Sequence, residues 1–225
     1  MTEPPASPEV AEAIRVQEQL RSRWEPAAWA GPAPRTLAGV DVAYDGTGEA
    51  EDRVAAAVVV LDAATLEVVD QATAVGTAGF PYLPGLFAFR EVPSLLRALE
   101  RLTVTPDVVL CDGQGLAHPR RFGLACHLGV VTGLPALGVG KTPLLGTWTE
   151  PGPERGDWSP VLDGGETVAR MLRTQPGVKP VTVSVGHRVD LDAATRFVLA
   201  AAPRYRLPET TRLADRLSCE ALRAG

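Results

Sequence analysis

The sequence predicts an α/β fold in which helices flank one mixed sheet. Three strand-like runs come first, and their short polar connections favour an antiparallel meander. Helical segments and short apolar strands then alternate, which indicates parallel strands joined by crossovers. With 225 residues, the chain is expected to form one domain over residues 35–225, preceded by an N-terminal helix and linker over residues 1–34.

The elements follow from local pattern. Residues 1–8 are expected to be disordered, and residues 25–34 form a Pro/Ala-rich linker. Strands are predicted at 36–44, 54–61, 67–75, 107–111, 135–139, 158–162, 167–174 and 181–185, and helices at 10–24, 91–102, 119–130, 191–202 and 209–222. The second strand is apolar without alternation, which predicts burial on both faces. Asp163-Gly164-Gly165 favours a hairpin turn between two of the later strands.

Composition excludes some classes of protein. The net charge is 22 minus 27, or −5, which argues against a protein that coats nucleic acid by bulk electrostatics. A nuclease is not excluded, because clustered acids that await metal ions add negative charge. Three cysteines without a CxxC motif indicate reduced thiols. The sequence has no apolar run long enough to predict a membrane span and no basic N-terminal leader that would predict a secretion signal. We expect a cytoplasmic protein with no membrane contact.

The loop before residue 91 is the most informative segment. Pro81 and Pro84 restrict the backbone and Gly85 relaxes it, so Tyr82 is expected at a rigid loop tip. Glu91 is expected to open the next helix, where the macrodipole favours a carboxylate. Such a segment suits an aromatic wedge beside a metal-binding acid, and it equally suits a packed turn with a helix-capping Glu.

Four acids are candidates for one metal site. Asp41 interrupts an apolar strand, which is costly unless the acid is paired or binds metal, and Asp112 ends a buried strand before Gly113. Glu91 and Asp215 add a third and fourth carboxylate. Convergent carboxylates suit Mg²⁺ and phosphoryl transfer. For Asp41 the alternative is a hydrogen-bonded structural Asp, for Asp112 a turn or N-cap residue, and for Asp215 a solvated helix residue.

Three basic residues are further candidates. Lys141 ends a short strand and could hold a scissile phosphate, although the first glycine of a phosphate loop is replaced by Pro135. His118 could order a phosphate or a water, and His187 could touch the nucleic-acid backbone. The alternatives are an exposed loop lysine for Lys141, a locally bonded residue at a helix N-terminus for His118, and a loop role for His187. The three histidines lack zinc-site spacing.

At this point the chain resembles the endonuclease V family, the deoxyinosine 3′ endonucleases among the ribonuclease H-like nucleases. The matching segments are Gly39-Val40-Asp41, Pro81-Tyr82-Leu83-Pro84-Gly85 with Phe89-Arg90-Glu91, Asp112-Gly113-Gln114-Gly115 with Ala117-His118-Pro119-Arg120, Gly138-Val139-Gly140-Lys141, Val183-Ser184-Val185-Gly186-His187-Arg188, and Tyr205-Arg206-Leu207-Pro208-Glu209-Thr210-Thr211-Arg212 with Asp215. They cover residues 36–218 in order.

The resemblance implies a ribonuclease H-like fold and a set of roles. Asp41, Glu91, Asp112 and Asp215 would bind Mg²⁺, with Mn²⁺ able to substitute, and Lys141 and His118 would complete the catalytic set. Tyr82 would be the strand-separating wedge. The remaining residues expected to bind substrate are Leu83, Pro84, Gly85, Phe87, Arg90, Gly113, Gly123, Leu124, Leu144 and His187.

The implied reaction is cleavage of the second phosphodiester bond 3′ to deoxyinosine, by a monomer, leaving 3′-hydroxyl and 5′-phosphate ends. Phe87 is bulkier than the aliphatic residue expected there, and Thr210 replaces a common proline. Rival hypotheses are a ribonuclease H-like nuclease for inosine-containing RNA, single strands, or branched or mismatched DNA, and a binding module that has lost catalysis. The second predicts missing carboxylates, whereas all the expected acids are present.

Overall fold

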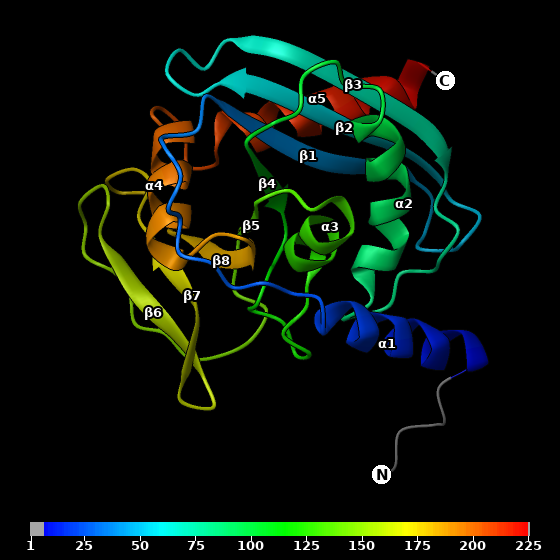
Figure 1. The fold of residues 1–225 in the computed structure, drawn as a ribbon, viewed down its shortest axis with the longest axis horizontal. Coiled ribbons are helices and arrows are strands. Elements are labelled where there is room, and N and C mark those ends of the chain that lie inside the picture. Colours follow the sequence, from blue (N-terminus) through cyan, green and yellow to red (C-terminus); the bar gives the residue numbers. More distant parts are fainter. Residues whose placement is uncertain (1–6, 225) are drawn as a thin grey trace.

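One mixed sheet of eight strands organises residues 7–224, the part of the chain that the computed structural model describes (Figure 1). Across the sheet the order is β3-β2-β1-β4-β5-β8-β7-β6. The strands are β1 Thr36–Asp45, β2 Arg53–Asp62, β3 Val68–Thr77, β4 Val108–Asp112, β5 Ala136–Gly140, β6 Trp158–Asp163, β7 Glu166–Leu172 and β8 Val181–His187. The first three pair antiparallel, and β4 pairs parallel with β1 and β5, which confirms the predicted fold class.

Helices cover both faces of this sheet (Figure 1). In residues 7–224 they are α1 Pro8–Arg21, α2 Phe87–Leu99, α3 Leu124–Thr132, α4 Leu191–Ala201 and α5 Glu209–Ala224. The apolar sides of α2 and α3 pack on one face, whereas α4 and α5 pack on the other. β2 lies between α2 and α5, and residues 54–61 are at most 1% exposed, which confirms the predicted burial on both faces.

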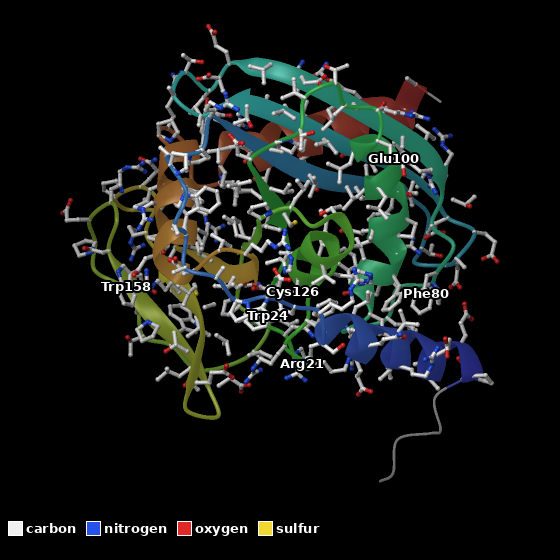
Figure 2. All side chains as sticks on the ribbon, viewed as in Figure 1. Arg21, Trp24, Phe80, Glu100, Cys126 and Trp158 are labelled. Carbon is white, nitrogen blue, oxygen red and sulfur yellow. The ribbon has the colours of Figure 1, made fainter. Side chains whose placement is uncertain are left out.

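The N-terminal helix α1 is packed against the domain. It contacts α3 and lies below the start of α2 (Figure 1). Beyond its end, Trp24 packs with Leu20 against Phe122 and Cys126 of the α3 region (Figure 2). No helix within residues 7–224 has the length and the apolar run needed to cross a bilayer.

Two predicted helix starts are wrong. Helix α2 begins at Phe87, so Glu91 lies in its second turn and the macrodipole argument does not apply to it. Helix α3 begins at Leu124 instead of Pro119, because Arg121 adopts a left-handed φ of 52° that no helix accommodates. The other predicted bounds agree within three residues. The predicted disorder falls on residues 1–6, outside the described residues, and is wrong at Pro8, where α1 begins.

Candidate active site

Two acids meet where β1 and β4 run side by side. Val40 is in register with Cys111 on the parallel neighbour, so Asp41 and Asp112 are the next residues on adjacent strands. Lys141 directly follows β5, the strand beyond β4, and its Nζ lies 3.3 Å from Asp112 Oδ2. Strand register therefore brings three of the predicted catalytic residues to one edge of the sheet.

Helices on opposite faces bring the other two acids to this edge. Glu91 of α2 is 5% exposed and accepts a 2.7 Å hydrogen bond from the Tyr44 hydroxyl of β1. Asp215 of α5 is exposed. One turn later, Ser218 Oγ donates to Asp41 Oδ2 at 2.6 Å, which holds α5 against β1. The edge thus receives carboxylates from both sides of the sheet.

Burial and repulsion from neighbouring acids disfavour charge on Asp41 and Glu91. Burial is the largest cause that raises the pKa of Asp41 from 3.8 to about 6, and the charges of Asp215 and Asp112 add to it against the Ser218 hydrogen bond. Burial also raises the pKa of Glu91 well above its usual value, with further contributions from Asp41 and Asp112. The charges of neighbouring acids thus act on both Asp41 and Glu91, which places these carboxylates in one site.

The donor set suits a hard divalent cation. All four side chains offer carboxylate oxygens, which are the ligands that Mg²⁺ and Mn²⁺ prefer. As the side chains lie, no three His, Cys, Asp or Glu groups within residues 7–224 are arranged around one ion position. Hydrogen-bond donors and Lys141 engage the oxygens of Asp41, Glu91 and Asp112 instead. The residues therefore fit such a cation by chemistry, and joint coordination requires them to leave these partners.

A cavity of about 230 Å³ opens beside the acids. Its lining residues are Gln17, Tyr82, Pro84, Gly85, Phe87, Ala88, Gly113, Gln114, His118, Phe122, Gly123, Leu124 and Leu144. Tyr82 is 56% exposed at its rim, and its ring meets Phe87 edge-on with centroids 5.9 Å apart. Gly113 directly follows Asp112, and Ala88 lies one turn before Glu91. Most of the predicted substrate-binding residues thus line one cavity that adjoins the carboxylates.

The structure does not bring Leu83 or Arg90 to this cavity. Leu83 packs toward α1 with Ala13 and Phe80. Arg90 is 2% exposed, pairs with Asp52 at 2.6 Å and donates to the Phe80 carbonyl at 2.8 Å. Both side chains help to hold the loop that carries Tyr82. Arg90 is buried there, whereas Leu83 stays half-exposed next to Tyr82.

The two candidate histidines are both buried and lie in different parts of the fold. His118 lines the cavity, and burial is the largest cause that lowers its pKa to about 4, so the imidazole is neutral at pH 7. His187 is 3% exposed and pairs with Ala136, the first residue of β5. Lys141, in contrast, follows the last residue of β5. His187 therefore lies toward the opposite edge of the sheet, where its Nδ1 accepts from the Glu25 amide at 3.3 Å.

Four functional candidates escaped sequence reasoning. Tyr44 and Ser218 hold the acids, and Gln17 and Gln114 line the cavity. Ser218 follows Asp215 by one helical turn, a spacing that places the two on the same side of α5. For Gln17 there was no local signal, because its partners lie 68 and 105 residues further along the chain.

Comparison with known proteins places this arrangement in a family. The family model described as Endonuclease V matches residues 17–216. Endonuclease V of Nocardia farcinica is 58% identical over 214 residues, covering 95% of this chain and 93% of the relative. The crystal structure of endonuclease V from Streptomyces avermitilis is 56% identical with a TM-score of 0.90, covering 98% of this chain and 95% of that one.

A more distant structure contains nucleic acid. Endonuclease V of Ciona intestinalis is 26% identical with a TM-score of 0.85, covering 97% of this chain and 99% of that one. It is in complex with a 23mer DNA containing an inosine followed by a ribo-adenosine.

Proposed function

The chain belongs to the endonuclease V family, and on that premise we propose that it is a Mg²⁺-dependent DNA repair nuclease that recognises deoxyinosine. The proposed reaction hydrolyses the second phosphodiester bond 3′ to the lesion. Mn²⁺ is proposed to replace Mg²⁺.

The observation that carries this proposal is the adjacency of cavity and carboxylates. Gly113 lines the cavity and Asp112 precedes it, while Ala88 lines the cavity one turn before Glu91. If a base occupies the cavity, a phosphodiester bond only a few nucleotides away along the same strand can therefore reach the acids. This geometry suits a nuclease that reads one base and cuts a nearby bond.

Recognition is proposed to require extrusion of the base from the duplex. Extrusion costs a few kcal/mol, less at a mispaired base. Tyr82 is exposed on a short loop that two prolines stiffen and that Arg90 anchors through the Phe80 carbonyl, so it can fill the vacated space. Stacking of an aromatic ring on a base contributes roughly 1–3 kcal/mol, which offsets part of the extrusion.

Hydrolysis is proposed to occur at the carboxylate edge. A water oxygen forms a bond to phosphorus and the bond from phosphorus to O3′ breaks, giving a 5′-phosphate and a 3′-hydroxyl. Asp41, Glu91, Asp112 and Asp215 would hold the cation, which when bound supplies charge stabilisation and an activated water. Lys141 lies beside Asp112 and can place its ammonium on the scissile phosphate. The Nδ1 of neutral His118 accepts from the Arg120 amide at 3.2 Å, so the ring has only its Nε2 hydrogen to donate inside the cavity.

Single-turnover cleavage of labelled duplexes tests the proposal. A duplex with one deoxyinosine should be cut in Mg²⁺, whereas the matched deoxyadenosine duplex should not. Asp41→Ala and Asp112→Ala should abolish cutting and retain measurable binding. Full activity in either variant would contradict the assignment of the acids.

A competition experiment separates DNA from RNA. The Ciona relative's DNA carries a ribonucleotide directly after the inosine, which makes the sugar 3′ to the lesion the position to vary. We expect the all-deoxy strand to compete at least as well as a strand with one ribonucleotide or an all-RNA strand. Preferential cutting of the RNA strand would establish the rival specificity.

A further inference from the structure

Gln17 of α1 is a buried amide that touches both walls of the cavity. It is 1% exposed, and its Nε2 donates to the Gly85 carbonyl at 3.2 Å and to the Phe122 carbonyl at 2.8 Å. Its Oε1 accepts from Arg120 Nε. An amide has two donor hydrogens and one acceptor oxygen, so groups from two loops of the domain satisfy this side chain.

One wall is the loop that carries Tyr82. Gly85 there has a φ of +80°, a conformation that suits glycine, and its carbonyl also accepts from Arg120 Nη2 at 2.5 Å. A Cβ at Gly85 would lie 2.9 Å from that guanidinium nitrogen. The loop is therefore held at one peptide, three residues after Tyr82, by donors from Gln17 and Arg120.

The other wall is the turn before α3. Phe122 is fully buried and lines the cavity, and Gly123, which follows it, is the N-cap of α3. Since Gln17 Nε2 bonds both the Phe122 and Gly85 carbonyls, one side chain of α1 spans the two walls. The separation of these walls would limit the size of a base that enters the cavity.

We propose that Gln17 is a positioning residue for base recognition, which fixes the separation of the two cavity walls and the placement of Tyr82. This inference rests on the proposed function of the cavity. It makes α1 a functional part of the nuclease. Without the amide, the buried Phe122 carbonyl and the part-buried Gly85 carbonyl each lose a donor and Arg120 loses an acceptor, so both walls relax. Preference for hypoxanthine and extrusion from a duplex should then weaken, whereas the carboxylates are untouched.

The test uses the full-length protein with a matched control on the same helix. Gln17→Met keeps the length of the side chain and removes its hydrogen bonds, and Gln19→Met makes the same change at an exposed position. The probe is a duplex with 2-aminopurine next to deoxyinosine, in EDTA, so that fluorescence reports extrusion without cleavage. We expect native protein and Gln19→Met to give equal rises and Gln17→Met roughly a tenfold weaker extrusion equilibrium, as befits loss of hydrogen bonds to buried groups.

Cleavage in Mg²⁺ supplies a second readout. For Gln17→Met, the ratio of kcat/KM on duplex to that on single-stranded inosine DNA should fall about tenfold, since a single strand needs little unstacking. Preference for inosine over adenine should fall as well. Gln17→Glu keeps an acceptor for Arg120 but has no donor, so it should behave like Gln17→Met.

Several results would overturn the inference. A fluorescence rise for Gln17→Met equal to that for Gln19→Met would do so. An equal fall of kcat/KM on duplex and single-stranded DNA, with the preference for inosine over adenine unchanged, would also do so, because it indicates a purely structural role. If Gln17→Met does not fold, Arg120→Lys is the second variant. It keeps one donor for Gly85 and should give an extrusion signal between those of native protein and a protein without the Gln17 bonds. A signal equal to that of native protein would refute the role of these hydrogen bonds in positioning the walls. Native protein that gives no signal would refute the proposed function instead.

Discussion

Replacing Asp41 by asparagine should make the metal-free protein more stable at neutral pH. Burial raises the pKa of Asp41 in the folded protein to about 6, from 3.8. Between about pH 4 and pH 6 the folded state keeps a proton that the unfolded state has released, so stability falls as pH rises through this window. Asparagine is neutral throughout and can still accept the hydrogen bond from Ser218.

The magnitude follows from the size of the shift. About two pKa units correspond to roughly 3 kcal/mol of free energy of unfolding above pH 7, which is an upper value because a partly exposed group can relax. For a protein of this size, that raises Tm by roughly 5–10 °C. At pH 4 native Asp41 is protonated in the folded state, so the gain should vanish.

Thermal unfolding in EDTA at pH 4, 5, 6 and 7.5 measures this effect. Asp62→Asn is the control, because three hydrogen bonds lower the pKa of that half-exposed acid, and its removal should not stabilise at any pH. Added Mg²⁺ should raise Tm of the native protein and leave Asp41→Asn unchanged. A variant no more stable than native protein at pH 7.5, or a gain that persists at pH 4, would refute the reasoning about buried charge.

Three further predictions concern the wedge, the lysine and the anchor. Tyr82→Ala should weaken binding to inosine duplex roughly tenfold in a mobility-shift assay without metal, through lost stacking, and leave single-strand binding unchanged; equal affinity for the duplex would count against a wedge. Lys141→Met should slow single-turnover cleavage roughly a hundredfold, through lost charge at the phosphate, with native affinity; a native rate would exclude Lys141 from the chemistry. Arg90→Leu should lower Tm by roughly 5 °C or more, because Asp52 and the Phe80 carbonyl lose their donor. The control Arg15→Leu, at an exposed position, should not lower Tm. An unchanged Tm for Arg90→Leu would show that this anchor of the loop is dispensable.

Local pattern was sufficient for the sheet and for the positions of Asp41 and Asp112. The apolar run of β2 is buried on both faces because α2 and α5 cover it, as the lack of alternation indicated. Asp41 and Asp112 are adjacent because their strands are parallel neighbours, a consequence of the order of elements along the chain. These features depend on periodicity and topology, which a single sequence carries.

Features that depend on distant partners could not be predicted. Arg90 looked like a substrate contact, yet Asp52, 38 residues earlier, holds it in the interior. The start of α3 shifted because Arg121 takes a left-handed conformation while bonding Asp163 and Glu166 of the β6–β7 hairpin. Gln17 belonged to a segment with no predicted role, and only the packing of α1 on the domain brings its amide to the cavity.

Mapping the cut on a long duplex with one deoxyinosine tests the central claim most directly. With Mg²⁺ and both strands end-labelled, the claim predicts a single nick at the second phosphodiester bond 3′ to deoxyinosine, with 3′-hydroxyl and 5′-phosphate ends. The nick should disappear in EDTA and in Asp112→Asn. Cutting that ignores the deoxyinosine, or that persists without a divalent cation, would contradict it.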